Sequence, residues 1–314
     1  NGGVRFEVAR ELALIDGRFE SGDLALLDLH ATNTPKYLTD KGRMRGTVKP
    51  PKSVLVRTDR LWTHYISFNT KNSFLAKKEV RQALTLALDR TWYLDKYYRG
   101  LAALADHVVP PSLNLHAPKP AYPWAYGKRD AKRAQELLAK AGFPGGKGLP
   151  EFILDSSGST DVEAAELEML KKSWAQIGVK VQPRVQKFAD MITRLRSGLN
   201  EIVVQHWFAD YPDPENFFLT LDSSKAPKLD VAVDSPNSGH WAHADYDRLY
   251  RDAFTLPPGE ARGRIFEQLI LIIQEECPWI FVAHPESAAL VAPGVEGFRT
   301  RSPYAAGYAG LRLK

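Results

Sequence analysis

Three stretches of the chain repeat apolar residues at helical spacing, so each is predicted to form an amphipathic helix. In the first, residues 79–90, one stripe is formed by Val80, Ala83, Leu84, Ala87 and Leu88. The second, residues 130–143, has Asp130 as a plausible N-cap and Gly142 as its stop. In the third, residues 161–178, one face is formed by Leu167, Leu170, Trp174 and Ile177.

Short apolar runs alternate with helices in the middle of the chain. The runs FILDSS, VKVQPRVQ and EIVVQHW are typical of strands, and the segments between them are predicted helices. This alternation indicates an α/β architecture with a largely parallel or mixed sheet. Later, ADYDRLYRDAF and EARGRIFEQLILIIQEEC are predicted helices, the second in the core, and WIFVAHPESAALV is expected to form a pair of strands.

Length and charge narrow the possible classes of protein. A chain of 314 residues suggests roughly two domains. The net charge of +5 is modest and its basic residues are scattered, which argues against a nucleic-acid partner. No apolar run approaches the ~18–20 residues of a membrane span, and the opening NGGVRFEV lacks the pattern of a signal peptide.

The sequence lacks the motifs that are typical of catalysis, metal binding and cofactor binding. The sequence has no HExxH, no GxSxG and no GxGxxG, and GFPGGKG is better explained as a glycine turn. The histidines of GHWAHADYD fit no standard zinc spacing, so Asp245 is expected to help start a helix there. The single cysteine, Cys277, is expected to be a small buried apolar residue. We therefore predict no catalytic residue, no metal and no cofactor.

The segment WFADYPDPENFF, residues 207–218, holds the candidate site. Asp210 follows a predicted buried strand and stands among Trp207, Phe208 and Tyr211. Aromatic neighbours lower the local dielectric and strengthen a charge-assisted hydrogen bond, so Asp210 could receive an ammonium group. The alternative is that Asp210 caps a turn through its own backbone, as Asp often does near proline. These residues alone leave both interpretations open.

The order of motifs resembles a known family. FNTKNSFLAKKEVRQALTLALDR is similar to the signature of the family 5 extracytoplasmic solute-binding proteins, the dipeptide and oligopeptide receptors of ABC importers. Four segments match further along: DAKRAQELLAKAGF, LKKSWAQIGVKV, WFADYPDPENFF and WAHADYDRLYRDA. RLRSG before a strand also fits. The resemblance covers nearly the whole chain.

The resemblance implies a type II periplasmic-binding-protein-like α/β fold, in which ligand is trapped between two lobes. Residues 1–67 would be a remnant of lobe one with strands entering the hinge, 68–286 lobe two, and 287–314 the return to lobe one. Members of the family are longer at the N-terminus, so the chain is expected to be N-terminally truncated and to hold mainly the second lobe.

The resemblance also implies a role for the candidate site. In peptide-binding members, the aspartate of the matching W-x-x-D motif pairs with the α-ammonium of the ligand, and Asp210 stands at that position. Trp207, Phe208 and Tyr211 would line the pocket, with His206 and Asn216 as further candidates, and Asn69 would be structural. The partner would be a membrane permease that receives the solute outside the cytoplasmic membrane from a monomeric receptor.

One departure leaves the ligand open. Oligopeptide receptors carry arginines for the peptide carboxylate on the preceding helix and strand, where this chain has Leu195 and Val204, with Arg194 and Arg196 only nearby. A non-peptide solute, such as a metal chelate or a sugar, is therefore an alternative within the family. A hydrolase using Asp210 and Asp213 is disfavoured, because the two acids are too close along the chain to face each other across a substrate.

Overall fold

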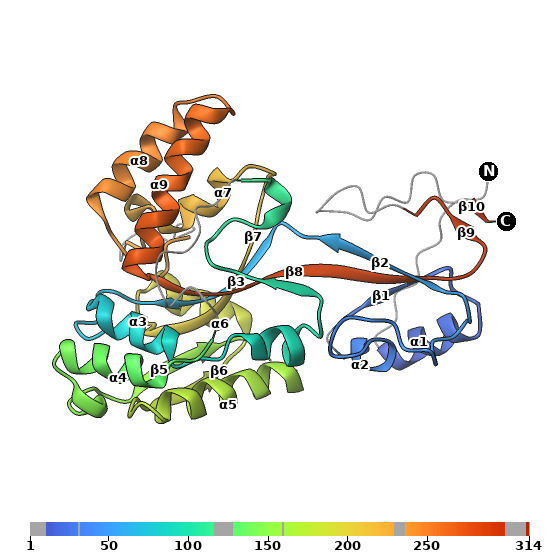
Figure 1. The fold of residues 1–314 in the computed structure, drawn as a ribbon, viewed down its shortest axis with the longest axis horizontal. Coiled ribbons are helices and arrows are strands. Elements are labelled where there is room, and N and C mark those ends of the chain that lie inside the picture. The colour runs from blue at the N-terminus through green and yellow to red at the C-terminus, as the bar shows by residue number, and fades with distance from the viewer. Residues whose placement is uncertain are drawn as a thin grey trace. The chain divides into compact units, whose positions relative to one another are not determined.

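The computed structural model describes residues 11–30, 32–115, 128–158, 160–228, 236–298 and 312–313. The chain divides into two compact units (Figure 1). Unit 1 comprises residues 1–61, 93–103 and 284–314, and unit 2 comprises residues 62–92 and 104–283. The predicted lobe boundaries at 67/68 and 286/287 differ from the unit boundaries at 61/62 and 283/284 by six and three residues. The segment Tyr93–Ala103, predicted in lobe two, falls in unit 1; the assignment of units to lobes stays a prediction.

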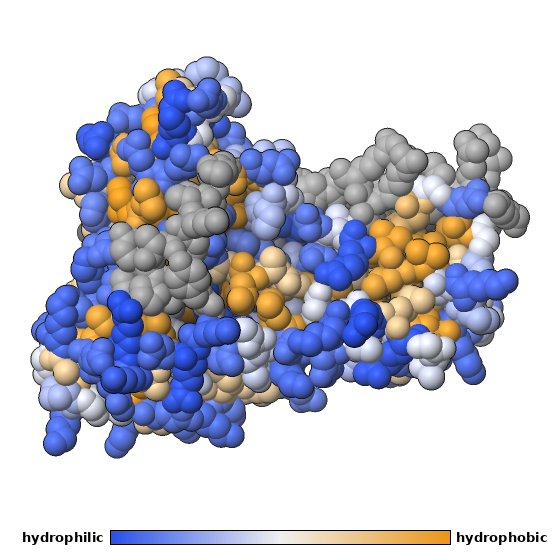
Figure 2. Space-filling model, viewed as in Figure 1, coloured by the Kyte–Doolittle hydropathy of each residue, from blue (hydrophilic) through white to orange (hydrophobic). Residues whose placement is uncertain are grey.

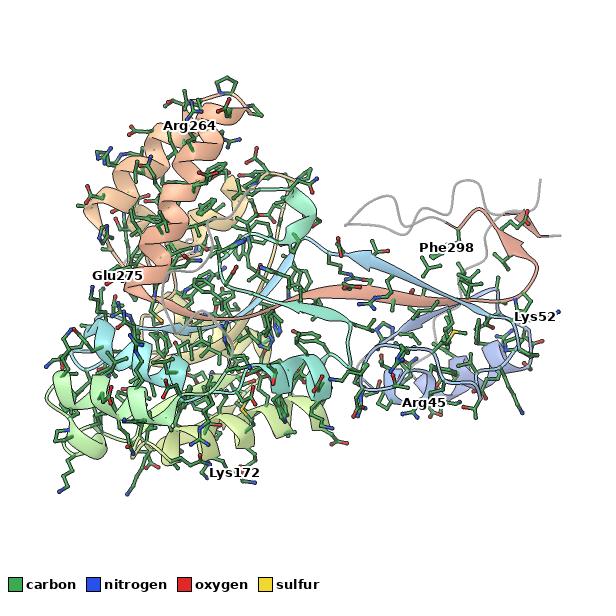
Figure 3. All side chains as sticks on the ribbon, viewed as in Figure 1. Arg45, Lys52, Lys172, Arg264, Glu275 and Phe298 are labelled. Carbon is green, nitrogen blue, oxygen red and sulfur yellow. The ribbon has the colours of Figure 1, made fainter. Side chains whose placement is uncertain are left out.

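Unit 1 packs two helices against a small antiparallel sheet. Strands β1 (Leu26–Leu29) and β2 (Val54–Asp59) both pair with the last part of β8 (Trp279–Val291). Helices α1 (Leu12–Glu20) and α2 (Thr34–Tyr37) pack beside β1, and Phe19, Leu27, Tyr37 and Leu290 belong to the shared core. Arg45, labelled in Figure 3, fixes the following loop by donating to the carbonyls of Pro35 and Leu38.

Unit 2 is an α/β domain built on a mixed sheet. Its strand order is β8, β3 (Trp62–Phe68), β7 (Ile202–Phe208), β5 (Phe152–Ser156), β6 (Val181–Val185). Strand β3 is antiparallel to β7 and β8, whereas β5 is parallel to both β6 and β7. The helical connections between β5, β6 and β7 give this parallel part, as the alternation in the sequence predicts.

Helices flank the sheet of unit 2 (Figure 1). They are α3 (Lys78–Leu86), α4 (Ala131–Lys140), α5 (Asp161–Ala175), α6 (Phe188–Arg196), α7 (Glu215–Phe218), α8 (Ala244–Phe254) and α9 (Glu260–Glu276). Helices α8 and α9 lie side by side. The outward faces of α4, α5, α8 and α9 are largely hydrophilic (Figure 2), and Lys172 on α5 and Arg264 on α9 both project from them (Figure 3).

The remaining described elements are short. A π-helical turn (Tyr93–Tyr97) precedes β4 (Ala102–Leu104), which pairs with β8. Near the end of the chain, β9 (Val295–Glu296) and β10 (Arg312–Leu313) form a separate pair. Most of the predicted return to lobe one after Phe298 lies outside the described residues.

Most predicted helices and strands of unit 2 are confirmed. Asp130 caps α4 by accepting a hydrogen bond from the backbone N of Arg133 at 3.0 Å. The predicted apolar face of α5 is buried, with Trp174 fully enclosed. The helix at 79–90 is shorter than predicted, since α3 ends at Leu86. Beyond it, Arg90 is buried and donates to the carbonyls of Ala105 and Phe281.

The prediction of two strands at 279–291 is wrong, since β8 is one strand of 13 residues. It changes partners along its length. Residues up to Ala283 pair with β3, and residues from Glu286 onward pair with β2. Pro285 stands in the interval between these two ladders, where its missing N–H costs no sheet hydrogen bond. A proline in the run is therefore compatible with an unbroken strand.

The VRQAL motif has a structural role within unit 2. Arg81 is 2% exposed, and its guanidinium donates to four backbone carbonyls, those of Leu75, Ala76, Glu276 and Cys277. The last two belong to the C-terminal end of α9, where carbonyls lack partners within the helix. Gln82 donates to the carbonyl of Glu275 in the same turn, and the Glu275 carboxylate (Figure 3) accepts from Lys78 at 2.7 Å. The motif thus joins α3 to the end of α9.

Candidate ligand-binding site

The candidate site lies at one edge of the sheet in unit 2. Because β5, β6 and β7 run parallel, their carboxyl ends, Ser156, Val185 and Phe208, meet at the same edge. In open α/β sheets, ligands bind outside the carboxyl ends of the strands. Asp210 follows the end of β7 by two residues, so the fold places its carboxylate at this edge.

Asn216 holds the two ends of the WFADYPDPENFF loop together. Its side-chain Oδ1 accepts hydrogen bonds from Nε1 of Trp207 at 3.0 Å and from the backbone N of Asp210 at 3.1 Å. Asn216 itself is 0% exposed. A fully enclosed side chain cannot touch a ligand without rearrangement. Asn216 is therefore a structural residue that holds the loop in place by hydrogen bonds.

The carboxylate of Asp210 is exposed, and within the described ranges it has no hydrogen-bond or ion-pair partner. The turn is capped by Asp213 instead, whose Oδ1 accepts from the backbone N of Glu215 at 2.8 Å. Its other oxygen pairs with Arg262 of α9 at 2.7 Å. The alternative in which Asp210 caps the turn is therefore wrong, and its charge is left available.

Glu215 anchors the loop to the neighbouring helices. This carboxylate is buried and accepts hydrogen bonds from the hydroxyls of Tyr211 and of Tyr250 on α8. Burial, followed by the hydrogen bond to Glu215, raises the pKa of both tyrosines above the ordinary value. Both phenols therefore remain protonated donors at neutral pH. Tyr211 nevertheless leaves 42% of its surface exposed beside Asp210.

An aromatic pair borders Asp210 on the strand side. Trp62 of β3 and Phe208 of β7 are register partners, and their rings stack with centroids 4.6 Å apart and planes inclined by 23°. Phe208 is 53% exposed, although it is one of the most apolar residue types. His206 packs its ring against the edge of Trp62, 5.2 Å between centroids. The sequence pattern gave no hint that Trp62 belongs here, because cross-strand register is set by the fold.

His206 lies next to this pair and is half-buried. It is the register partner of His64, with ring centroids 4.2 Å apart, and Nε2 of His64 lies 3.2 Å from Oε1 of Glu166. Burial and the neighbouring His64 lower the pKa of His206 to about 3, while Glu166 and Glu163 oppose this shift. His206 is thus a neutral imidazole at physiological pH.

Five of the six predicted site residues are neighbours in sequence, within residues 206–211, and Asn216 accepts hydrogen bonds from two of them. Their role as a ligand site stays a prediction. The structure adds Trp62 and Arg262, which lie far from the loop in sequence. It also adds Glu215, which lies within the loop but was not predicted as a site residue. Across the described ranges, no group of three His, Cys, Asp or Glu side chains could hold a metal ion. Where the helices are described, none has the length and apolar content needed to span a membrane.

The histidines of GHWAHADYD also have local roles. His243, rather than Asp245, is the N-cap of α8, and its Nδ1 accepts from the backbone N of Tyr246. Asp245 stands in the first turn of the helix with its side chain exposed.

Comparisons with known proteins show which proteins the chain is similar to. Residues 3–228 match the family described as bacterial extracellular solute-binding proteins, family 5 Middle. Heme-binding protein A of Haemophilus influenzae is 30% identical over 263 residues, which are 81% of this chain and 45% of that protein. A probable di/tripeptide-binding protein 5 of Pseudomonas aeruginosa is 29% identical over 248 residues, 77% of this chain and 44% of that protein.

Solved structures share the fold. The periplasmic binding protein DppA of Helicobacter pylori, in complex with the peptide STSA, superposes with a TM-score of 0.76 at 22% identity, covering 97% of this chain and 56% of that chain. The α/β fold is therefore that of type II periplasmic binding proteins. The chain spans about half the length of the curated relatives it matches.

Proposed function

Since the chain belongs to the family 5 bacterial extracellular solute-binding proteins, we propose that it captures peptides or similar amine-bearing solutes outside the cytoplasmic membrane and delivers them to the permease of an ABC importer. The site acts by binding alone. The relatives reported above are named as binding proteins, and the sequence carries no catalytic motif.

The unpaired carboxylate of Asp210 is the observation that carries this proposal. A charge held at the carboxyl edge of a sheet by a buried hydrogen bond, yet without a partner among the described residues, calls for a cationic ligand. A hydrogen bond between ions is worth about 1.5–3 kcal/mol net. Asp210 would receive the ammonium group, Phe208 and Tyr211 would contact the ligand, Trp207 would form the wall behind them, and Asn216 would position both ends of the loop.

A peptide or amine fits these charges better than a heme or an anionic chelate. The carboxylates of a heme or of an anionic chelate would face the negative charge of Asp210. Asp213 and Glu215 follow Asp210 in the sequence of the same loop. The rings of the two histidines nearest the site, His64 and His206, contact each other, and the Nε2 atom of each is buried away from an incoming metal. The heme-binding relative makes this alternative worth testing directly.

Native mass spectrometry of the protein purified without refolding tests the proposal, since tightly held solutes survive such purification. We expect a set of peptide or amine masses that is lost in an Asp210→Ala variant and kept in a variant of another exposed aspartate of unit 2, Asp190→Ala. A single retained mass of a non-amine compound, unchanged by Asp210→Ala, would keep the family and discard the ammonium anchor. Added hemin that binds equally well to both variants would favour a heme-type ligand.

A further inference from the structure

In the stacked pair Trp62 and Phe208, Trp62 is half-buried and the ring of Phe208 is largely exposed. Phe208 occupies the last position of β7, and its ring is held flat against Trp62 from the adjacent strand. Full burial of a phenylalanine side chain stabilises by roughly 1.5–3 kcal/mol, and much of this gain is unused while 53% of Phe208 faces solvent. We refer to Trp62 and Phe208 together as the aromatic shelf.

The shelf is firmly supported from beneath. Trp62 and Phe208 are direct register partners of an antiparallel pair, as are His64 and His206 two positions further along. The His206 ring contacts the edge of Trp62 and lies against the His64 ring at a tilt of 35°. Cross-strand aromatic contacts of this kind stabilise a sheet and restrict the rings. A ligand would therefore meet a preformed surface, which reduces the entropy lost on binding.

The shelf and the free carboxylate are neighbours along the chain. Phe208 precedes Asp210 by two residues, so their Cα atoms lie at most about 7 Å apart. Ala209 between them is buried, whereas Phe208 and Asp210 are both exposed. An exposed carboxylate with no partner among the described residues and an exposed apolar ring thus stand two residues apart.

We propose that the aromatic shelf is a subsite for an apolar, preferably aromatic, side chain borne on the carbon next to the ligand's ammonium group. The inference rests on the proposed function, because Asp210 must hold that ammonium group. In a peptide, the N-terminal residue carries both features on one Cα, so a single residue spans the anchor and the shelf. Stacking on Trp62 and Phe208 adds to apolar burial when the incoming group is a ring.

The chemistry also states which ligands are disfavoured. An acidic first side chain would lie beside Asp210, where the two like charges repel each other. A glycine at the first position would satisfy Asp210 and leave the shelf uncovered. The site is thus expected to rank peptides by their first side chain, in the order aromatic, aliphatic, glycine, acidic.

The test compares two dipeptides, Phe-Ala and Gly-Ala, titrated into the 314-residue protein with 15N-labelled tryptophan. Dissociation constants come from calorimetry, and the indole N–H signal of Trp62 is identified by its absence in Trp62→Phe. We expect Phe-Ala to bind at least roughly tenfold more tightly than Gly-Ala, in line with the burial of one aromatic side chain. The Trp62 signal should shift with Phe-Ala and stay unchanged with Gly-Ala.

Variants separate the shelf from the anchor. Phe208→Ala, at an exposed position that leaves the core intact, should abolish the preference for Phe-Ala while Gly-Ala binds as before; Trp62→Ala should act in the same way. Phe254→Ala removes a phenylalanine that is 66% exposed at the end of α8 and serves as the control. Phenethylamine, which shares the amine and ring without a peptide bond, should also shift the Trp62 signal.

Each outcome decides between the two proposals. Equal affinities for Phe-Ala and Gly-Ala, or a preference that survives in Phe208→Ala, would overturn the shelf. If Gly-Ala binding still weakened in Asp210→Asn in that case, the proposed function would stand although the shelf proposal had failed. Absence of binding by both dipeptides and by phenethylamine would overturn the shelf and the amine anchor together.

Discussion

The carboxamide oxygen of Asn216 accepts a hydrogen bond from the indole Nε1 of Trp207 at 3.0 Å, and the same oxygen also accepts from the backbone N of Asp210. One buried atom thereby fixes the direction of a large ring and of the peptide unit that carries the free carboxylate. The position of the candidate anchor is thus set by a residue that the solvent never reaches.

Replacement of Asn216 by leucine should loosen this arrangement. Both donors would lose their acceptor inside the protein, and an unsatisfied buried donor costs about 1–3 kcal/mol. We expect a lower free energy of unfolding and faster hydrogen exchange at the backbone amide of Asp210. Asn216→Asp keeps an oxygen at the same place and should preserve the protection of that amide. Unchanged hydrogen exchange at the Asp210 amide in Asn216→Leu would contradict this structural role of Asn216.

Substitution of Arg81 should lower the free energy of unfolding strongly, although Arg81 is not part of the candidate site. Its guanidinium serves four carbonyls at once, in a planar fork that a lysine cannot reproduce. We expect Arg81→Lys to lower the free energy of unfolding by about 2–4 kcal/mol, because several carbonyls lose a charged donor. Chemical denaturation measures the loss, and Arg251→Lys at an exposed position of α8 is the control. A change below about 0.5 kcal/mol, the size typical of surface substitutions, would be inconsistent with this role.

His206 should make stability depend on pH. Burial lowers its pKa to about 3 in the folded protein, below the ordinary value of about 6.5 in an unfolded chain. The unfolded state therefore binds the proton first, so stability is full above pH ~6.5 and falls as the pH drops from there toward 3. Between pH 6.5 and pH 5 the loss from this one group is about 2 kcal/mol.

The pH effect is measured by denaturation of the wild type and of His206→Gln at several pH values. A neutral side chain removes this contribution, so the variant should lose less stability on acidification than the wild type does. His30→Gln, at an exposed histidine of unit 1, should retain the wild-type dependence. Parallel curves for the wild type and His206→Gln would show that the imidazole titrates normally.

The sequence predicted the helices and strands of unit 2 well where periodicity was strong and caps were local. Asp130 and the apolar face of α5 are examples, since both depend on residues three or four positions apart. The continuous course of β8 was missed because its partners change at Pro285, which depends on strands more than 200 residues earlier.

The candidate site was predictable only in part, for the same physical reason. The carboxylate, its aromatic neighbours and the loop are contiguous, so the sequence points to them. The pairing of Phe208 with Trp62 depends on the register between β7 and β3, and the burial of Asn216 and Glu215 depends on packing against β7 and α8. Neither the strand register nor this burial can be predicted from the local spacing of residues in the sequence.

Four dissociation constants test the central claim most directly: those of a dipeptide with a free amino terminus and of its N-acetylated form, each for the wild type and for Asp210→Asn. If Asp210 binds the ammonium group, the free dipeptide should bind the variant about 10- to 100-fold more weakly. The acetylated form, which has no charge to lose, should bind both proteins weakly and alike. Equal affinity of the free dipeptide for the wild type and Asp210→Asn, or an equal loss for both ligands, would contradict the account.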